Sequence, residues 1–156
     1  MAEIKRDEDG KVIRIEEEHH VDMARRTAKE CSVLMGFGEV KTALIATSVS
    51  ELARNILVHA GKGTVVLRAI SQEENPPSPP FGKGGLGGFS GERRGLEIVF
   101  ADQGPGIEDI ERVLKGGYST KGSSGIGLSG AKRMMDEMEI ESGSGKGTTI
   151  WIRKWL

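Results

Sequence analysis

The stretch Leu96–Ser129, LEIVFADQGPGIEDIERVLKGGYSTKGSSGIGLS, decides the fold that this chain can adopt. Its first part, Leu96–Ala101, is apolar and rich in residues that favour sheets, which predicts a strand. Asp102 follows directly, so its carboxylate is expected at the end of a sheet, where a side chain can meet a ligand. Gly104 and Gly106 come next and allow a positive φ or a close approach of the backbone.

The last part of the same stretch predicts the start of a helix over Ile126–Met138. Gly125 and Gly127 lie at its N-terminus, where unpaired backbone N–H groups and the positive end of the helix dipole favour phosphate. An acid that can bind a base edge and a helix N-terminus that can bind phosphates together indicate a nucleotide pocket.

The glycine motifs of other nucleotide-binding folds do not fit this chain. The run GIGLSG at 125–130 has the glycine spacing of a dinucleotide fingerprint, but a polar loop, and not a strand, precedes it. The segments GKGT at 61–64 and 145–148 lack the spacer and the Lys-Ser/Thr pair of a P-loop. The chain also lacks the His-Arg-Asp and Asp-Phe-Gly triplets of eukaryotic-type kinases. Each glycine cluster, taken alone, is better explained by a turn.

The composition indicates one cytoplasmic domain over residues 1–156 that binds neither nucleic acid nor membrane. The 22 basic and 23 acidic residues give a net charge of −1, and aromatic residues make up only 4%. A basic surface and a base-stacking platform are therefore not expected. Cys31 is the only cysteine, which excludes an internal disulfide and most zinc sites. The chain has no apolar run long enough to span a membrane and no signal-peptide pattern.

Hydrophobic periodicity predicts an α+β two-layer sandwich. Helices are expected over Val21–Met35 and Glu39–Ala60, and strands over Val12–Glu16, Thr64–Ile70, Leu96–Ala101, Glu137–Ser142 and Thr148–Lys154. Met1–Lys11 is charged and is expected to be frayed. Because helices do not alternate strictly with strands, a sandwich is favoured over a doubly wound parallel sheet.

Residues 71–94 interrupt this pattern with a proline run followed by FGKGGLGGF. Such a composition buries too little apolar surface to offset the entropy of ordering it, so we expect a disordered insert within a hairpin loop. A polyproline ligand for an adaptor domain is the alternative interpretation.

Glu51 and Asn55 lie four residues apart in the helix predicted over Glu39–Ala60, so both project from one helical face. The neighbouring Leu52 and Ile56 belong to the apolar stripe, which places the two polar groups at the edge of the core. In isolation, a solvated glutamate and an asparagine near a helix end are the simpler explanation.

The motifs carry more information in combination. The chain contains, in this order, Glu51-x-x-x-Asn55, Asp102-x-Gly104-x-Gly106, Gly125-Ile-Gly-Leu and Gly147-Thr148-Thr149. This arrangement resembles the ATPase superfamily of DNA gyrase, the 90-kilodalton heat-shock chaperones, sensor histidine kinases and mismatch-repair ATPases. Within that superfamily, the chain is most similar to bacterial anti-sigma-factor serine/threonine kinases, especially stressosome switch kinases. The resemblance implies a histidine-kinase-like ATPase fold with a mixed, mainly antiparallel sheet and helices on one face.

The resemblance also implies a role for each motif residue. Glu51 would be the general base, Asn55 a Mg²⁺ ligand, and Asp102 the acceptor for the adenine amino group of ATP. Gly106 would give the adenine ring close access, and Thr148 would support the contact between Asp102 and adenine. The loop Tyr118–Ser124 would close as a lid. The remaining residues of the implied nucleotide-binding set are Gly104, Ser119, Thr120, Lys121, Gly122, Ser123, Ser124, Gly125, Ile126, Gly127 and Leu128.

The implied function is an ATP- and Mg²⁺-dependent protein serine/threonine kinase. Its partner would be a STAS-type anti-sigma-antagonist protein or a stressosome scaffold, and after release it would activate a PP2C-type phosphatase. The alternative is an anti-sigma factor that sequesters a sigma factor with ATP as a structural ligand. The ATP-binding half of a histidine kinase fits less well, because no phospho-acceptor histidine helix precedes the domain.

Overall fold

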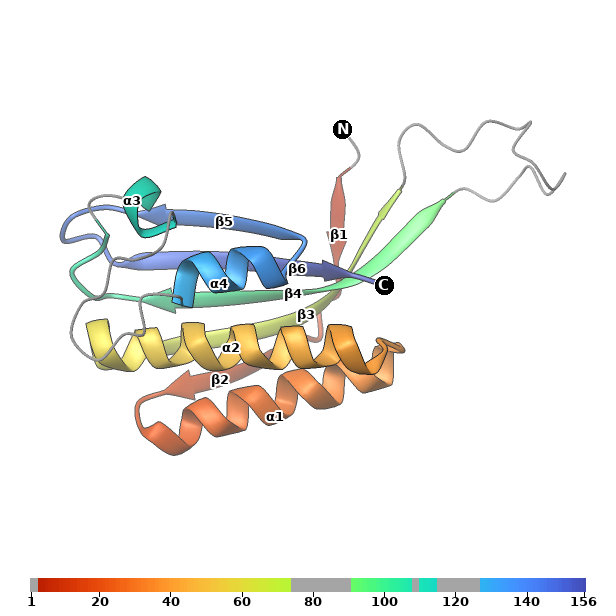
Figure 1. Ribbon diagram of the computed structural model, residues 1–156, viewed down its shortest axis with the longest axis horizontal. Helices are drawn as coiled ribbons and strands as arrows, with labels where there is room; N and C mark the ends of the chain where they lie inside the picture. Colours follow the sequence, from red (N-terminus) through yellow and green to blue (C-terminus); the bar gives the residue numbers. More distant parts are fainter. Residues whose placement is uncertain (1–2, 74–90, 108–109, 115–126) are drawn as a thin grey trace, which may run out of the picture.

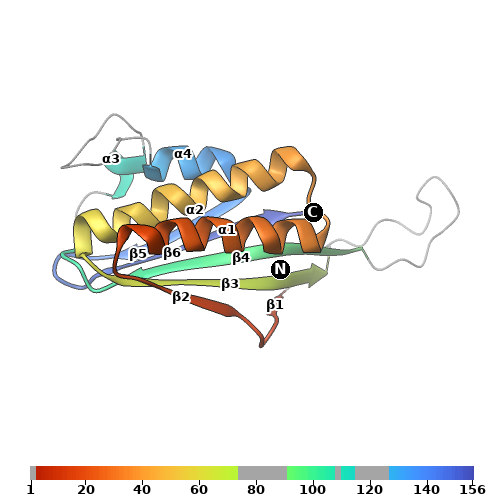
Figure 2. The same ribbon diagram turned by 90° about the horizontal axis from the view of Figure 1, so that it is seen from below.

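The protein forms two layers, a sheet and a set of helices that covers one face of it (Figures 1 and 2). The structure, a computed structural model, describes residues 3–73, 91–107, 110–114 and 127–156. The strands are β1 (Ile4–Arg6), β2 (Lys11–Ile15), β3 (Gly63–Glu73), β4 (Glu92–Asp102), β5 (Glu137–Ser142) and β6 (Thr148–Trp155). The helices are α1 (Glu18–Met35), α2 (Glu39–Ala60), α3 (Ile110–Leu114) and α4 (Gly127–Met134). The predicted α+β two-layer sandwich is confirmed.

The sheet has the strand order β1-β3-β4-β6-β5, and β2 also pairs with β3. β1 pairs with the later part of β3 and β2 with its earlier part, so the two short strands follow one another along one edge. Each of the described pairings is antiparallel. At the end of β4, Asp102 lies opposite Gly63 of β3 on one side and Thr148 of β6 on the other. The motif acid therefore sits in the middle of one end of the sheet.

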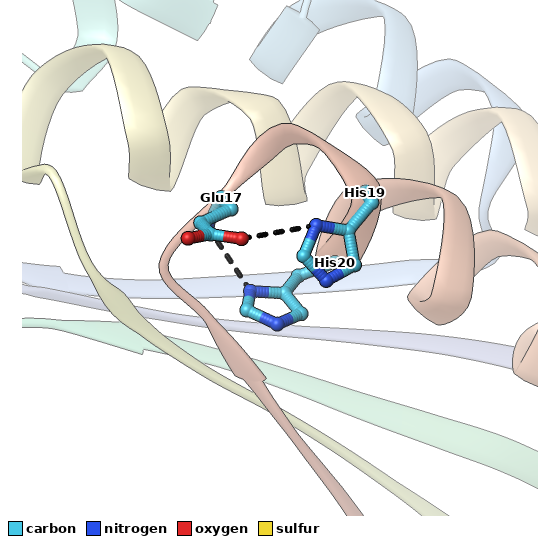
Figure 3. A group of neighbouring side chains, drawn as sticks. All are labelled: Glu17, His19 and His20. Carbon is cyan, nitrogen blue, oxygen red and sulfur yellow. Dashed lines mark hydrogen bonds and ion pairs between the residues drawn. The ribbon is translucent and has the colours of Figure 1, made fainter.

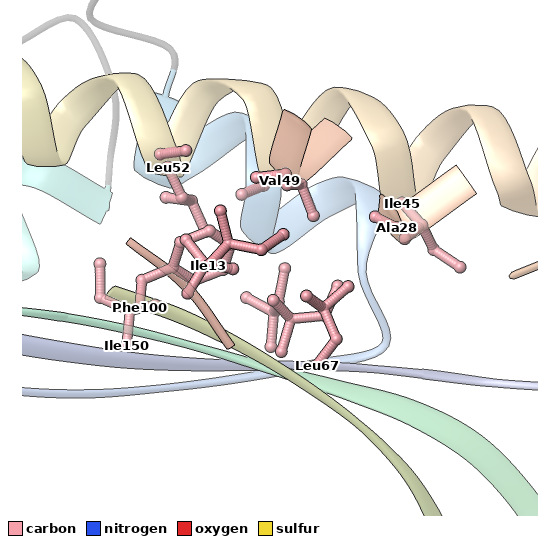
Figure 4. Close-up of a cluster of buried hydrophobic side chains, with 14 of the residues drawn as sticks. Ile13, Ala28, Ile45, Val49, Leu52, Leu67, Phe100 and Ile150 are labelled. Atoms are coloured by element: carbon pink, nitrogen blue, oxygen red, sulfur yellow. The ribbon is translucent and has the colours of Figure 1, made fainter. Parts of the chain in front are cut away.

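The core lies between the helices and the sheet, as Figure 4 shows for part of it. From α2, the predicted face is buried: Ile45 and Val49 are fully buried and Leu52 is 1% exposed. These side chains pack against sheet residues such as Leu67 and Phe100. Burial of each large apolar side chain contributes about 1.5–3 kcal/mol. The core thus fixes the rotation of α2, and with it the direction of its polar motif residues.

The buried face of α1 differs slightly from the apolar pattern Val21, Ala24, Ala28 and Cys31 of its sequence. Val21, Ala24 and Ala28 are buried, but Ser32 is fully buried and Cys31 only partly. The Ser32 hydroxyl donates to the carbonyl oxygen of Ala28 at 2.7 Å, so its burial leaves no unpaired polar group. A serine can therefore occupy a core position that the apolar pattern did not predict.

A charged network lies on the sheet face opposite the helices. Glu97 of β4 is 1% exposed, and its carboxylate accepts hydrogen bonds from Arg6 and Arg153, each at 2.7 Å. Burial alone would raise the pKa of Glu97, but the hydrogen bonds from the two guanidinium groups outweigh burial and lower it. Arg6 belongs to β1, so this ion pair ties the N-terminal strand to the sheet. The prediction that Met1–Lys11 is frayed was therefore wrong for Ile4–Arg6.

The hairpin strands extend beyond the predicted bounds. β3 continues to Glu73 and β4 begins at Glu92, and these two residues are cross-strand partners. Arg93 donates to the Gln72 side chain at 3.0 Å and lies over the ring of Trp155 at 3.8 Å. Both ends of the predicted insert 71–94 therefore belong to the sheet, while 74–90 lie outside the described residues.

The helix expected over Ile126–Met138 is also shorter than predicted. α4 ends at Met134, and β5 begins at Glu137. The N–H of Asp136 already donates to the carbonyl oxygen of Arg153 at 3.0 Å, because the chain has joined the sheet at that point. Among the described residues, no helix combines the length and apolarity needed to cross a membrane.

Candidate functional site

Asn55 of α2 lies against the start of α4. A Cβ built on Gly127 would be 3.0 Å from Nδ2 and 3.5 Å from Oδ1 of Asn55. The absence of a side chain at Gly127 therefore lets the amide of Asn55 lie directly against the first turn of α4, where helical N–H groups have no intrahelical acceptor. Glu51 lies one turn earlier on α2 and, like Asn55, is half-buried. The structure thus brings Asn55 of the Glu-Asn motif to the start of α4.

Asp102 and Thr148 meet at the end of the sheet. They are cross-strand partners of β4 and β6, Asp102 is half-buried and Thr148 is 8% exposed. Oδ1 of Asp102 accepts the N–H of Gly104 at 2.9 Å, which closes a local turn. A Cβ on Gly104 would be 2.7 Å from Cβ of Ala60, so this turn packs on the end of α2. The turn after Asp102 therefore lies at the C-terminal end of α2, the helix that carries the Glu-Asn motif.

The motif glycines are explained by backbone packing. Gly106 has a φ of 83°, and a Cβ there would be 2.0 Å from the carbonyl oxygen of Gly143. A Cβ on Gly147 would be 2.3 Å from the carbonyl oxygen of Asp102. At these two glycines, the backbones of the loop after β4 and of the turn between β5 and β6 thus lie directly against other backbone atoms. The expected access of adenine past Gly106 stays a prediction.

Ser142, which the sequence analysis missed, joins these segments. Its Oγ accepts the N–H of Ile107 at 2.7 Å, donates to the carbonyl oxygen of Gly147 at 3.1 Å and lies 2.8 Å from Oγ1 of Thr148. No sequence motif marks this serine. Only the register of β5 and β6, which pairs Ser142 with Thr148, could have indicated it.

Part of the implied nucleotide-binding set lies outside the described residues, so its contacts stay predictions. Those positions are Ser119, Thr120, Lys121, Gly122, Ser123, Ser124, Gly125 and Ile126. Leu128 is described and is 7% exposed within the core cluster. Its side chain therefore anchors α4 to the core, and only its backbone remains available to a ligand.

A group formed by Glu17, His19 and His20 begins α1 (Figure 3). One possible ligand atom from each residue lies within 4.8 Å of the others, a spacing compatible with a metal ion. However, Nδ1 of His20 accepts the N–H groups of Glu16 and Glu17, both at 3.0 Å. Nδ1 of His19 forms an ion pair with Glu17 at 3.2 Å when the ring is protonated. We therefore interpret this group as a cap that satisfies backbone donors at the start of α1.

An open pocket lies between the first turns of α1 and the middle of α2. Glu18 and Arg54 form an ion pair across it at 3.0 Å. The pocket is lined by Glu18, His19, Val21, Asp22, Arg25, Ser50 and Arg54. Charged side chains of both signs therefore surround this pocket.

Comparisons with known proteins agree with this geometry. Residues 4–154 match the histidine kinase-like ATPase domain family. The chain is 40% identical over 148 residues to the serine/threonine-protein kinase RsbT of Bacillus subtilis (strain 168), with 95% of this chain and 98% of that protein covered. It is 38% identical over 115 residues to the anti-sigma F factor of Clostridium acetobutylicum, with coverage of 70% and 67%. The anti-sigma F factor of Thermoanaerobacter sp. (strain X514) is 29% identical over 118 residues, with coverage of 72% and 68%.

Proposed function

The chain belongs to the histidine kinase-like ATPase domain family, and from this premise we propose that it is an ATP- and Mg²⁺-dependent protein serine/threonine kinase. One observation carries the proposal. Asn55 lies against the start of α4, and Asp102 and Thr148 are cross-strand partners at the end of β4. Figure 1 shows the end of α2, the start of α4 and the end of β4 together at that end. This end is the proposed ATP site.

Asp102 and Thr148 form the proposed adenine end. One carboxylate oxygen of Asp102 is occupied by the N–H of Gly104, which fixes the carboxylate plane. The second oxygen is proposed to accept a hydrogen bond from the adenine amino group. The Thr148 hydroxyl, on the neighbouring strand, would act beside it, directly or through a water molecule.

The start of α4 and Asn55 form the proposed phosphate end. The N–H groups of the first turn of α4 point out of the helix, and the helix dipole favours negative charge there. The side-chain oxygen of Asn55 is a hard ligand of the type that Mg²⁺ prefers, and its place against Gly127 fits that role. When bound, Mg²⁺ neutralises charge on the β- and γ-phosphates.

Glu51 is the proposed general base. Its carboxylate would take the proton from a serine or threonine hydroxyl as that oxygen forms a bond to the γ-phosphorus. The bond from the γ-phosphorus to the bridging oxygen of ADP breaks in the same transfer, and ADP leaves. The α-helical spacing of Glu51 and Asn55 supports this division of roles, because base and metal ligand then face one site from a single rigid helix.

The proposed substrate is a STAS-type anti-sigma-antagonist protein, free or as part of a stressosome scaffold. The open pocket that Ser50 and Arg54 of α2 line together with Glu18, Asp22 and Arg25 of α1 presents charges of both signs. A polar segment of the substrate is proposed to dock in this pocket, on the side of α2 that faces α1. After the phosphorylated partner releases it, the kinase is proposed to activate a PP2C-type phosphatase in the cytoplasm.

The second candidate function is a sequestering anti-sigma factor with ATP as a structural ligand. Its support is the similarity to two proteins named anti-sigma F factor. Both functions need the same ATP site, so nucleotide binding cannot separate them. They differ in whether Glu51 is needed after ATP is bound.

The test is phosphotransfer to purified STAS-domain partners, followed by mass spectrometry of the partner. We expect a phosphoserine or phosphothreonine that forms only with Mg²⁺. Glu51→Ala should bind ATP nearly normally but transfer phosphate about 10²–10⁴-fold more slowly, because the base is lost. Glu30→Ala removes an exposed glutamate of α1 and serves as the matched control, with transfer unchanged.

Two results would count against the proposal. If Glu51→Ala lost ATP affinity and turnover equally, Glu51 would be a ligand-binding residue and not the base. If ATP-dependent binding to a sigma factor were tight while every tested STAS partner stayed unmodified, the sequestering function would be favoured.

A further inference from the structure

We propose that Ser142 is a positioning residue that sets the hydrogen-bond polarity of the Thr148 hydroxyl. Through Thr148, it would make the nucleobase site select purines with a 6-amino group over purines with a 6-oxo group. This inference rests on the proposed function, since it assumes that the end of the sheet at Asp102 binds the base of ATP.

Three contacts meet at the Ser142 hydroxyl. The N–H of Ile107 donates to it at 2.7 Å, and it donates to the carbonyl oxygen of Gly147 at 3.1 Å. Oγ1 of Thr148 lies 2.8 Å away. These partners come from the loop after β4, from the turn before β6 and from β6 itself. One side chain thus links three segments that surround Asp102.

The proton of each hydroxyl can be assigned by counting. A serine hydroxyl has one proton and two lone pairs. The proton of Ser142 is used for Gly147, and one lone pair is used by the N–H of Ile107. The remaining lone pair can only accept, so the arrangement that makes all three contacts hydrogen bonds has Thr148 as the donor in the 2.8 Å contact, and our proposal adopts it. Thr148 then has only lone pairs left for a ligand.

The consequence is a nucleobase site with two acceptors side by side. Asp102 presents a carboxylate oxygen, and Thr148, its cross-strand partner, presents hydroxyl lone pairs. An exocyclic amino group can donate to such a pair. A 6-oxo group would place a third acceptor at the position where the amino group supplies protons, and buried unpaired acceptors are strongly disfavoured. Because Thr148 is only 8% exposed, a water molecule is a poor substitute for the 6-amino donor that a 6-oxopurine lacks.

Removal of the Ser142 hydroxyl should free the Thr148 hydroxyl from donating its proton to residue 142. The Thr148 proton would lose its acceptor and could rotate toward the ligand, where it would donate to a 6-oxo group. The N–H of Ile107 would also lose its partner. The polarity of the site, and not only its stability, is therefore expected to change.

The test compares the affinity for ATP with the affinity for inosine triphosphate, measured by calorimetry. Wild type should prefer ATP, and Ser142→Ala should lower the ratio of the two affinities about tenfold, the value of one hydrogen bond. Ser142→Thr keeps a hydroxyl at this position and should restore the ratio. Thr148→Val should lower the ratio as well, and adding Ser142→Ala to it should change the ratio no further, because Ser142 acts through Thr148.

Ser32→Ala is the matched control, because it also removes a buried serine hydroxyl with a backbone acceptor. It should lower the melting temperature and leave the affinity ratio unchanged. If Ser142→Ala weakens both nucleotides equally, the inference is overturned and Ser142 is merely structural. If Ser142→Ala does not fold, Thr148→Val decides instead: an unchanged ratio of the affinities for ATP and inosine triphosphate in that variant overturns the inference. Failure of wild type to bind ATP would overturn the proposed function, and this inference with it.

Discussion

Replacement of Gly106 by alanine should destabilise the protein through two separable costs. At a φ of 83°, an alanine would adopt the left-handed region, which costs about 1–2 kcal/mol. Its Cβ would also lie 2.0 Å from the carbonyl oxygen of Gly143, so one of the two segments must move. Overpacking of this kind costs about 1–3 kcal/mol. We therefore expect the free energy of unfolding to fall by about 2–5 kcal/mol.

Gly145 offers a matched control within the same region. Its φ is 73°, but a Cβ there would have no atom within 4 Å. Its N–H donates to the carbonyl oxygen of Pro105 at 2.7 Å, and alanine would keep that bond. Gly145→Ala should therefore cost only the backbone term of about 1–2 kcal/mol. The difference between the two variants isolates the packing of the loop after β4 against the turn before β6.

The assay is urea unfolding followed by circular dichroism, with calorimetry of ATP binding on the folded proteins. In thermal unfolding, each kcal/mol should lower the melting temperature by about 2–4 °C in a domain of this size. Gly106→Ala should also lose most of its ATP affinity, because the loop that orients Asp102 is displaced, whereas Gly145→Ala should keep it. Equal destabilisation of both variants, with ATP binding preserved in both, would refute the reasoning.

Three further expectations concern Asp102 in the nucleobase site, the buried carboxylate of Glu97 and the hairpin of β3 and β4. Asp102→Asn should weaken ATP binding about tenfold, because an amide is a poorer acceptor than a carboxylate. The pKa of Glu97 is lowered in the folded protein. The ionised Glu97 carboxylate therefore stabilises the fold fully above the ordinary glutamate pKa of about 4.3. This contribution is lost as the pH falls through the lower pKa of the folded state. Glu97→Gln should therefore flatten the loss of stability on acidification. Replacement of residues 74–91 by Asn-Gly should preserve fold and ATP binding, because Glu73 and Glu92 are already cross-strand partners that a two-residue turn can join.

Each of these has its own measurement and contrary outcome. Unchanged calorimetric affinity in Asp102→Asn would contradict the adenine assignment. Stability measured by urea unfolding from neutral to acidic pH checks Glu97, and identical acid profiles for wild type and Glu97→Gln would contradict its role. A markedly lower melting temperature of the shortened hairpin would show that the replaced residues stabilise the domain.

Sequence alone determined the elements whose signal is local. The apolar stripe of α2 recurs at helical spacing, so it predicted both the helix Glu39–Ala60 and its buried face. The same periodicity placed Glu51 and Asn55 on one side of that helix, and the strand before Asp102 followed from its composition. The family could be recognised because four short motifs keep their order along the chain. Each single signal lies within one or two turns of helix, one strand or one short motif, and the family needed only the order of the motifs along the chain.

Only the tertiary structure decided features that depend on partners far apart in sequence. β1 exists because it pairs with β3 and because Arg6 bonds to Glu97, a residue 91 positions later. Gly106 is needed because the backbone of Gly143 approaches it, which no local pattern records. Ser142 gains its role only when Ile107 and Thr148 are brought beside it. Hydrogen-bond partners and close backbone contacts are set by strand register, and register is decided by how the whole core packs against the sheet.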